Sequence, residues 1–214
     1  MALTFPYPLA FLSAHLCTTD GVQLEIMRND EQSGSGDGRY WTSQLARPLW
    51  KATLNLAAKH AADARALNAK IWALDGTKNA FLWSDPSYSG ATGGTAGTGV
   101  TVSAISTDRT RVSLTGLPAS FAIAAGDRLS ISYGSGRVYY GTFAEDRTAS
   151  SAGAAASTAV FPYIPAGVSV GDAVEMDKPF FKAFVPPDGF TPYPVNPKYK
   201  WAEGASITLI QRVS

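Results

Sequence analysis

The stretch from Leu49 to Pro86, LWKATLNLAAKHAADARALNAKIWALDGTKNAFLWSDP, decides the fold of this 214-residue chain. Its first part alternates apolar with polar residues, and the apolar ones are Trp50, Ala52, Leu54 and Leu56. A two-residue period buries one face of a β-strand and leaves the other face in water. The stretch therefore predicts a strand at its start.

A helix is predicted to follow this strand. Apolar residues recur at steps of three and four along one helical face, at Ala64, Leu67, Ile71 and Leu74. Asp75-Gly76 ends the helix, because glycine readily takes the left-handed conformation found at helix C-termini. A helix this short is not stable alone in water, so we expect it to pack on the sheet.

A second short strand, from Asn79 to Trp83, is predicted after the helix and stops at Asp85-Pro86. The unit is therefore strand, helix, strand. Its largest apolar side chains are expected in the core, namely Trp50, Trp72, Phe81 and Trp83.

The composition narrows the class of protein. Hydrophobic residues make up 45% of the chain, enough to build a core for one large or two small domains. Charged residues make up only 16%, a low share that is compatible with a surface covered by partners. The net charge of +1 disfavours a protein that binds nucleic acid through backbone phosphates. Cys17 is the only cysteine, which excludes an internal disulfide and any multi-cysteine metal site.

The first twenty residues predict an extended arm. Aromatic and aliphatic residues alternate along it, with prolines among them, at Phe5, Tyr7, Leu9 and Phe11. Because proline cannot donate to a strand ladder, we expect an edge strand or a segment laid on a partner. The segment lacks the basic start of a signal peptide, and the chain has no apolar run of about eighteen residues. We therefore expect no membrane span. We also expect the protein to be assembled in the cytoplasm.

Two strands and a polar loop are predicted next. Val22, Leu24 and Ile26 alternate with polar residues, and a strand resumes at residues 39–42. Between them, residues 29–38 read NDEQSGSGDG, which is typical of a long hairpin tip. The pair makes either a projecting β-arm or an ordinary flexible loop, and the sequence leaves both open.

The character of the sequence changes after residue 86. Residues 87–99 are nearly all Gly, Ser, Thr and Ala, which predicts a linker or a long surface loop. Short apolar stretches then recur between residues 100 and 176, separated by turns such as Gly134-Ser135-Gly136. Strands at roughly ten-residue spacing with turn signals indicate a small β-barrel or sandwich.

The chain ends in a proline-rich run and a clear strand, Ser206 to Val213, which has no hairpin partner nearby in sequence. The economical solution pairs it with the strands before residue 90, so that the middle module is an insertion. We predict a mainly β fold with one helix (α+β). A belt-like β-sandwich domain comprises residues 1–95 and 184–214, and a small β-barrel is inserted at 96–183.

No catalytic or cofactor-binding motif stands out. The two histidines, His15 and His60, have no nucleophile or acid motif beside them, and no G-x-S-x-G is present. The glycine-rich stretches at 34–38 and 93–99 lack the lysine of a phosphate-binding loop. We expect no enzyme activity, no cofactor and no metal.

Tyrosines of the middle module leave a binding function open. Such rings can stack on sugars or bases, although alternating aromatics in a barrel usually fill its core. The candidates for stacking on a glycan are Tyr133, Tyr139, Tyr140 and Tyr163. An oligonucleotide-binding barrel is disfavoured by the balanced charges of the module. A cell-wall hydrolase has no motif behind it.

Five segments together carry a resemblance. They are RYWTSQLARPLWKATLNLAA (39–58), ARALNAKIWALDGTKNAFLWSDP (64–86), AAGDRLSI (124–131), YYGTFAEDRTASSAG (139–153) and VFPYIPAGVSVGDAVE (160–175). The first two look like the strand that begins the belt, and the helix and strand that follow it, in the distal tail proteins and related minor tail proteins of long flexible-tailed bacteriophages (siphophages) and gene transfer agents. The other three resemble the small barrel, OB-like or galectin-like, that such proteins insert in the belt. The resemblance runs from about residue 20 to the end.

The resemblance implies a structural virion protein at the tail tip. Distal tail proteins form a hexameric baseplate ring that joins the tail tube protein to the tail hub or tip protein. DNA passes through the lumen without specific binding, and the tape measure protein is a further candidate partner. The aromatic residues expected at subunit contacts are Phe5, Tyr7, Phe11, Tyr40 and Trp41. The alternative is a carbohydrate-binding module that recognises host surface glycans.

Overall fold

A computed structural model describes residues 3–16, 21–34, 36–194 and 200–213. Cys17, and Pro197 of the proline-rich run, lie outside the described residues. The fold is mainly β, with several antiparallel sheets and one twelve-residue helix, α2 (Ala61–Trp72). The only other helix in the described ranges, α1 (Ala10–Ser13), has four residues. The predicted fold class, mainly β with one helix, is confirmed.

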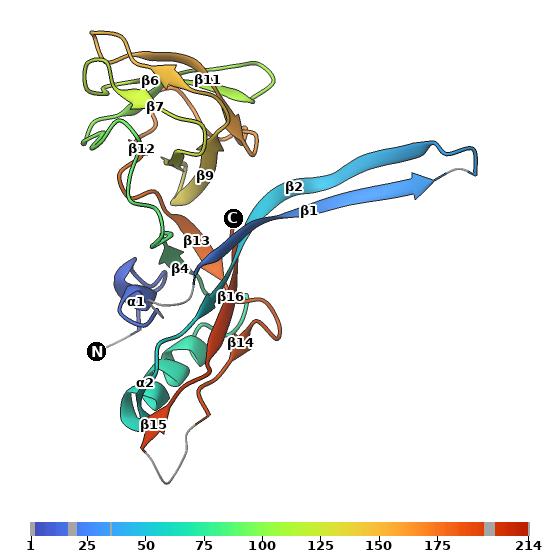
Figure 1. Ribbon diagram of the computed structural model, residues 1–214, viewed down its shortest axis with the longest axis vertical. Coiled ribbons are helices and arrows are strands. Elements are labelled where there is room, and N and C mark those ends of the chain that lie inside the picture. The colour runs from blue at the N-terminus through green and yellow to red at the C-terminus, as the bar shows by residue number, and fades with distance from the viewer. Residues whose placement is uncertain (1–2, 17–20, 35, 195–199, 214) are drawn as a thin grey trace.

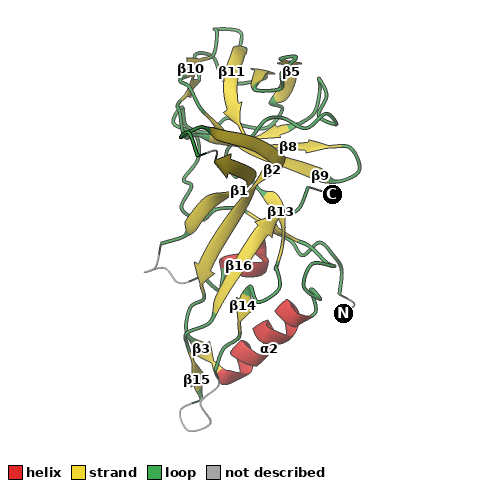
Figure 2. Cartoon of the chain, turned by 90° about the vertical axis from the view of Figure 1, so that its right-hand side faces the viewer, coloured by secondary structure: helices red, strands yellow, loops and turns green. Residues whose placement is uncertain are grey.

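Two modules lie one above the other along the long axis (Figures 1 and 2). The first module contains α2 and a six-stranded sheet in the order β1-β2-β16-β13-β4, with β14 also paired to β16. Its strands are β1 (Gln23–Gly34), β2 (Tyr40–Asn55), β4 (Phe81–Trp83), β13 (Phe181–Phe184), β14 (Phe190–Thr191) and β16 (Ser206–Gln211). A separate short pair is formed by β3 (Lys59–His60) and β15 (Trp201–Ala202).

The last strand of the chain lies beside one of the earliest. β16 pairs antiparallel with β2 in a register that places Ile207 opposite Leu54 and Leu209 opposite Ala52. All four side chains are buried. The prediction that the final strand pairs with strands before residue 90 is therefore confirmed, and the strands between β4 and β13 form an inserted module.

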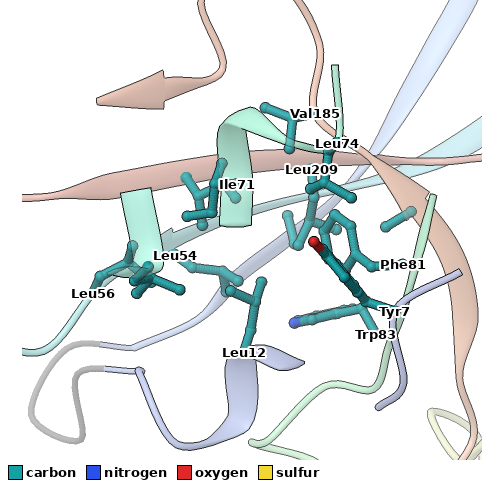
Figure 3. Packing of buried hydrophobic residues seen from close by; sticks show 14 of the residues in the cluster. Tyr7, Leu12, Leu54, Leu56, Ile71, Leu74, Phe81, Trp83, Val185 and Leu209 are labelled. Carbon is teal, nitrogen blue, oxygen red and sulfur yellow. The ribbon is translucent and has the colours of Figure 1, made fainter. Parts of the chain in front are cut away.

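The helix α2 packs on this sheet through the predicted face. The buried apolar residues of that face are Ala64, Leu67 and Ile71, and Leu74 is buried in the turn that follows the helix. Figure 3 shows Ile71 and Leu74 beside Leu209 of β16. The helix ends at Trp72, a few residues before the predicted Asp75-Gly76, and its C-cap Ala73 is right-handed. Asp75 and Gly76 take positive φ, 54° and 61°, in the turn that follows.

The core of the first module differs from the prediction at one tryptophan. Trp50, Phe81 and Trp83 are buried as expected, but Trp72 is 62% exposed. Trp72 directly follows Ile71, and a helix turns by about 100° per residue. Its side chain therefore points away from the face that packs on the sheet.

The inserted module contains a second six-stranded sheet in the order β12-β8-β9-β11-β6-β5. Its strands are β5 (Thr101–Ile105), β6 (Arg111–Thr115), β8 (Arg128–Tyr133), β9 (Arg137–Phe143), β11 (Ala155–Phe161) and β12 (Val174–Glu175). A short pair, β7 (Ala122–Ile123) and β10 (Arg147–Thr148), lies beside it. A second hydrophobic core fills this module.

The described strands form no closed barrel, which corrects the expected OB-like or galectin-like barrel. The two edges of the sheet approach each other through one bridge, Thr101 to Ala173, and a few backbone hydrogen bonds. β12 has only two residues, and both pair with β8. A strand this short leaves too little ladder to join β5 along its length.

The glycine-rich segment 87–99 is anchored to the inserted module instead of forming a free linker. The backbone N–H of Thr92 donates to both carboxylate oxygens of Asp127 at 3.1 Å. The N–H groups of Ala96 and Gly97 donate to Asp177 at 2.6 and 3.1 Å. Small residues allow the backbone to approach these carboxylates closely, a role that composition alone does not distinguish from flexibility.

The return to the first module comes earlier than predicted. β13 pairs with both β4 and β16, so residues 181–183 belong to the first sheet. The sequence placed this boundary after residue 183, because the two modules have similar strand composition and no glycine-rich segment marks the crossing.

The N-terminal segment folds back on its own chain. Tyr7 forms a parallel bridge with Phe81, and the amide of Leu82 donates to the carbonyl oxygen of Tyr7 at 2.8 Å. α1 follows, and Leu12 is buried in the first core (Figure 3). Of the two expectations for this segment, an edge strand or a segment laid on a partner, the bridge of Tyr7 to β4 at the edge of the sheet supports the first. The alternating aromatics find their apolar cover on β4 of the same chain.

Candidate functional site: a projecting arm and the junction at its base

A β-hairpin projects from the first module. β1 and β2 continue together beyond the sheet and turn between Gly34 and Tyr40 (Figure 1). Every described residue from 30 to 46 is exposed. Six residue pairs, from Asn29–Ala46 to Gly34–Tyr40, give the free part a length of about 20 Å. We call residues 28–47 the arm, and it corresponds to the projecting hairpin that the sequence left as one of two readings.

The arm carries large apolar side chains that its own chain leaves in water. Tyr40, Trp41 and Leu45 are 76%, 69% and 66% exposed. β1 is the edge strand of its sheet, so its outer backbone groups face no other strand among the described residues. A two-stranded hairpin is marginally stable by itself. Exposed apolar residues and an open edge are typical of a surface that is covered in an assembly.

The arm bends at its base, where β2 is longer than β1. The register shifts twice, between the pairs Met27–Leu49 and Asn29–Ala46 and again before Asp30–Gln44. At each shift β2 contributes one residue more than β1, which is the pattern of a β-bulge. Because bulges bend and twist a strand pair, the direction of the arm is determined at residues 44–49.

The inserted module contacts the arm at this bend. The guanidinium of Arg47 lies over two aromatic rings, 5.3 Å from the centroid of Tyr139 and 5.2 Å from that of Tyr163. Its Nη2 donates to the backbone carbonyl oxygen of Tyr163 at 2.6 Å. Burial lowers the pKa of Arg47 from its ordinary value, and the neighbouring tyrosines partly oppose this effect. An arginine remains charged at neutral pH, so both contacts involve a cation.

A second arginine makes a similar contact from β1. The guanidinium of Arg28 lies 5.5 Å from the centroid of Phe161, and its Nη1 lies 3.6 Å from a carboxylate oxygen of Asp30. Phe161 is the last residue of β11, two residues before Tyr163. Both strands of the arm therefore contact the same short segment, 161–163.

Below the bend, a tyrosine of the inserted module lies in the core of the first module. Tyr140 of β9 is fully buried, and its ring meets Trp50 and Phe181 edge to face at centroid distances of 5.5 and 5.0 Å. The indole N–H of Trp50 donates to the carbonyl oxygen of Tyr140 at 3.0 Å. Burial raises the pKa of the Tyr140 hydroxyl to about 12. The two modules thus share a packed interface.

A buried ion pair lies at the same junction. Arg128 donates through Nη1 to the carboxylate of Asp85 and, at 3.3 Å, to the hydroxyl oxygen of Tyr140. Asp85 is 3% exposed, and it also accepts from the N–H and the hydroxyl of Ser87 at 2.8 and 2.7 Å. The turn predicted at Asp85-Pro86 is confirmed, and the same carboxylate joins β8 to the end of β4.

The five predicted interface aromatics fall into two groups. Tyr40 and Trp41 are exposed on the arm, where another subunit can reach them. Tyr7 is buried, so its own chain already covers it, which corrects that assignment. Phe11 is partly buried against the same core, and its assignment stays a prediction. Phe5 is 38% exposed, with its ring centroid 4.9 Å from that of Tyr7.

The four predicted stacking tyrosines do not form a shared surface. Tyr133, Tyr139 and Tyr140 are 6%, 1% and 0% exposed, so none offers a ring face to a sugar. Tyr139 donates its hydroxyl to the carbonyl oxygen of Pro162, and burial raises its pKa. Tyr163 is 39% exposed, with Arg47 over its ring. The first three are therefore corrected to core residues.

Neither histidine lies in a cluster that could hold a metal. The part of the chain that the structure describes contains no group of three or more His, Cys, Asp or Glu suited to a metal ion. His60 is the N-cap residue of α2, and its ring meets Trp201 edge to face at 4.7 Å. His15 is half-buried, and burial, followed by the charge of Lys59, lowers its pKa.

No helix among the described residues is long and apolar enough to cross a membrane.

A cavity of about 290 Å³ lies between the N-terminal segment and the junction. Its lining includes Leu16, Trp83, Asp85 and Lys178. The indole nitrogen of Trp83 has no hydrogen-bond partner among the described residues, but it is itself inaccessible from the cavity. The carboxylate of Asp85 is already occupied by Arg128.

Sequence reasoning misses the arginines of the junction. Arg47 and Tyr163 are separated by 116 positions, so no local periodicity connects them. One signal was present. Arg47 precedes Pro48 at the point where an exposed strand becomes a buried one, and proline within a strand marks a bulge or an edge.

Comparisons with known proteins identify no relative. No family model matches the sequence, and no curated protein is significantly similar to it. The function is therefore argued from the residues and their geometry.

Proposed function

We propose that this chain is a structural protein of a phage-like virion, a distal tail adaptor at the tail tip. In this role six copies form a ring that joins the tail tube protein to the tail hub protein and leaves a channel for DNA. The single observation that carries the proposal is the arm, which exposes Tyr40 and Trp41 at its far end, about 20 Å from the body.

The arm has the properties that ring closure requires. In a cyclic ring each subunit offers one surface to a different surface of its neighbour. An arm with exposed aromatic rings and an open strand edge can reach across such a boundary, and covering those rings removes a large apolar area from water. Fixing the arm on a neighbour also compensates for the weak stability of a free two-stranded hairpin.

The charge of the chain supports the same role. Only 16% of its residues are charged, and the net charge is +1. Surfaces that become covered in an assembly are depleted in charged residues. A nearly neutral protein also lacks the excess of lysine and arginine that binds DNA through phosphates, which suits a channel through which DNA passes freely.

The family resemblance agrees with this reading. Residues 39–58 and 64–86, which resemble the belt of distal tail proteins, contain β2, α2 and β4. β2 is also the strand that extends into the arm. One of the segments that carry the resemblance, residues 39–58, therefore includes one strand of the arm.

The glycan-binding alternative loses most of its candidate residues. Burial removes Tyr133, Tyr139 and Tyr140 from any outer surface. Tyr163 is the remaining ring, and Arg47 already lies over it. One half-covered ring is a poor platform for a sugar, so the adaptor role is favoured.

Electron microscopy of the purified protein, alone and mixed with its cognate tail tube protein, tests the proposal. Six-fold rings with a central hole are the expected result. Two-lobed single particles in both samples would reject the adaptor role. A screen against host surface polysaccharide on the same preparation tests the alternative: glycan binding by a protein that forms no rings would favour the carbohydrate-binding module.

A further inference from the structure

We propose that the inserted module is a bracket that fixes the direction of the arm, with Arg47 and Arg28 as its positioning residues. The inference rests on the proposed function only for its purpose, which is to aim the arm at a neighbouring subunit. The contacts themselves belong to a single chain and can be tested in it.

Both strands of the arm are anchored on one segment of the inserted module. Arg47 of β2 lies over the rings of Tyr139 and Tyr163 and donates to the Tyr163 carbonyl oxygen at 2.6 Å. Arg28 of β1 lies 5.5 Å from the ring centroid of Phe161. One anchor would leave the hairpin free to rotate about it, whereas two anchors on opposite strands restrain that rotation.

The anchor at Arg47 lies where the arm bends. The two bulges of β2 lie between residues 44 and 49, and Arg47 lies within them. A bulge interrupts the regular ladder, so it is the place where a two-stranded ribbon bends most easily. A contact at this point controls the angle of everything beyond it, including Tyr40 and Trp41 at the far end.

The inserted module is itself held firmly against the first module. Tyr140 of the inserted module is buried against Trp50 and Phe181 of the first module. The ion pair of Arg128 with the buried Asp85 crosses the same junction. Because these contacts fix the two modules to each other, segment 161–163 is a stationary support for the arm.

The chemistry of arginine suits this task. A guanidinium is planar, so it can lie over aromatic rings while its edge N–H groups donate to a carbonyl oxygen. Arg47 makes both kinds of contact at once. Alanine would make neither contact, so Arg47→Ala and Arg28→Ala remove the anchors while the strand backbone remains.

The test is a distance measurement between spin labels by pulsed electron paramagnetic resonance. One label is placed on the arm at Thr42→Cys and one on the inserted module at Ser151→Cys, both exposed, in a Cys17→Ser background. A second labelled pair, Ala66→Cys on α2 with Ser151→Cys, reports the arrangement of the two modules. The full chain is used without tail tube protein, so the result does not depend on ring formation.

We expect a single narrow distance between arm and module, which broadens in the Arg28→Ala, Arg47→Ala double variant while the module pair stays narrow. Tyr163→Ala should broaden the same distance from the other side of the contact. Arg65→Ala, an exposed arginine on α2, is the matched control and should change neither distance. The inference would be overturned if the distance between arm and module stayed equally narrow without both arginines. It would also be overturned if that distance were already broad in the parent protein. If the arm moved freely and the protein still formed rings, the positioning role of the inserted module would be rejected, while the adaptor role would remain supported.

Discussion

The indole N–H of Trp50 donates to the backbone carbonyl oxygen of Tyr140 at 3.0 Å, and this bond joins β2 of the first module to β9 of the inserted module. The two rings also meet edge to face, with an interplanar angle of 90°. Both residues are buried, so the polar contact lies inside an apolar junction. The two modules therefore behave as one packed unit at this point.

Trp50→Phe should lower the free energy of unfolding by about 1–3 kcal/mol, because a buried carbonyl oxygen loses its donor. Trp72→Phe is the matched control: Trp72 is 62% exposed and should change stability by no more than about 0.5 kcal/mol. Urea unfolding followed by circular dichroism measures both. Equal effects at the two positions would show that the junction bond contributes nothing.

Asp85→Ala should be more damaging, because it removes a buried carboxylate that accepts from Ser87 and pairs with Arg128, whose side chain is 21% exposed. Breaking one half of a fully buried pair costs about 3–5 kcal/mol, and the partial exposure of Arg128 makes the lower end of that range the expected loss. Glu25→Ala provides the comparison, since Glu25 pairs with Lys51 at 2.7 Å on an exposed strand. An exposed pair is worth at most about 1 kcal/mol. Urea unfolding measures the loss of unfolding free energy in both variants. A loss for Asp85→Ala no larger than that for Glu25→Ala would contradict the structural role of the ion pair.

Tyr40→Thr with Trp41→Ser should leave stability within about 0.5 kcal/mol of the parent protein, because both side chains are exposed. Assembly should nevertheless be lost, since these rings are the apolar contacts that the arm offers. Light scattering and the unfolding midpoint measure the two effects separately. The control is Trp72→Ser, which removes an exposed tryptophan away from the arm and should leave assembly intact. Undiminished ring formation by the arm variant would place the subunit contact elsewhere.

The sequence predicted the elements whose cause is local. The alternation from Trp50 to Leu54 became the buried face of β2, and the three- and four-residue spacing from Ala64 to Ile71 became the buried face of α2. The lack of a nearby partner for the final strand correctly indicated its pairing with β2. In each case the element is stabilised by burying one of its faces, and a periodic sequence pattern indicates that face directly.

The errors share a different cause. A pattern shows that one face of a strand is apolar, but not which part of the chain covers it. Tyr140 was considered as a sugar platform, yet the first module covers its ring. Tyr7 was expected at a subunit contact, yet β4 of its own chain covers it. The arginine contacts that fix the arm join distant parts of the chain, such as Arg47 and Tyr163, 116 positions apart, which no local signal connects.

The buried tyrosines predict how the protein responds to alkaline pH. Burial raises the pKa of the hydroxyls of Tyr88 and Tyr140 to about 12 from the ordinary 10.0, and burial also raises that of Tyr139. Above pH 10 the unfolded chain releases these protons while the folded protein keeps them. The folded state then binds more protons, so the free energy of unfolding falls as pH rises.

Their contribution should thus be complete below pH 10 and be lost progressively between pH 10 and about pH 12. Urea midpoints measured across this range test the sign, and tyrosinate absorbance should rise together with unfolding. Tyr140→Phe keeps the ring and the carbonyl oxygen that accepts from Trp50, and it should reduce the fall. Tyr40→Phe changes an exposed ring and should leave the fall of unfolding free energy unchanged. A Tyr140→Phe protein that loses stability as steeply as the parent would show that burial of this hydroxyl does not govern the alkaline transition.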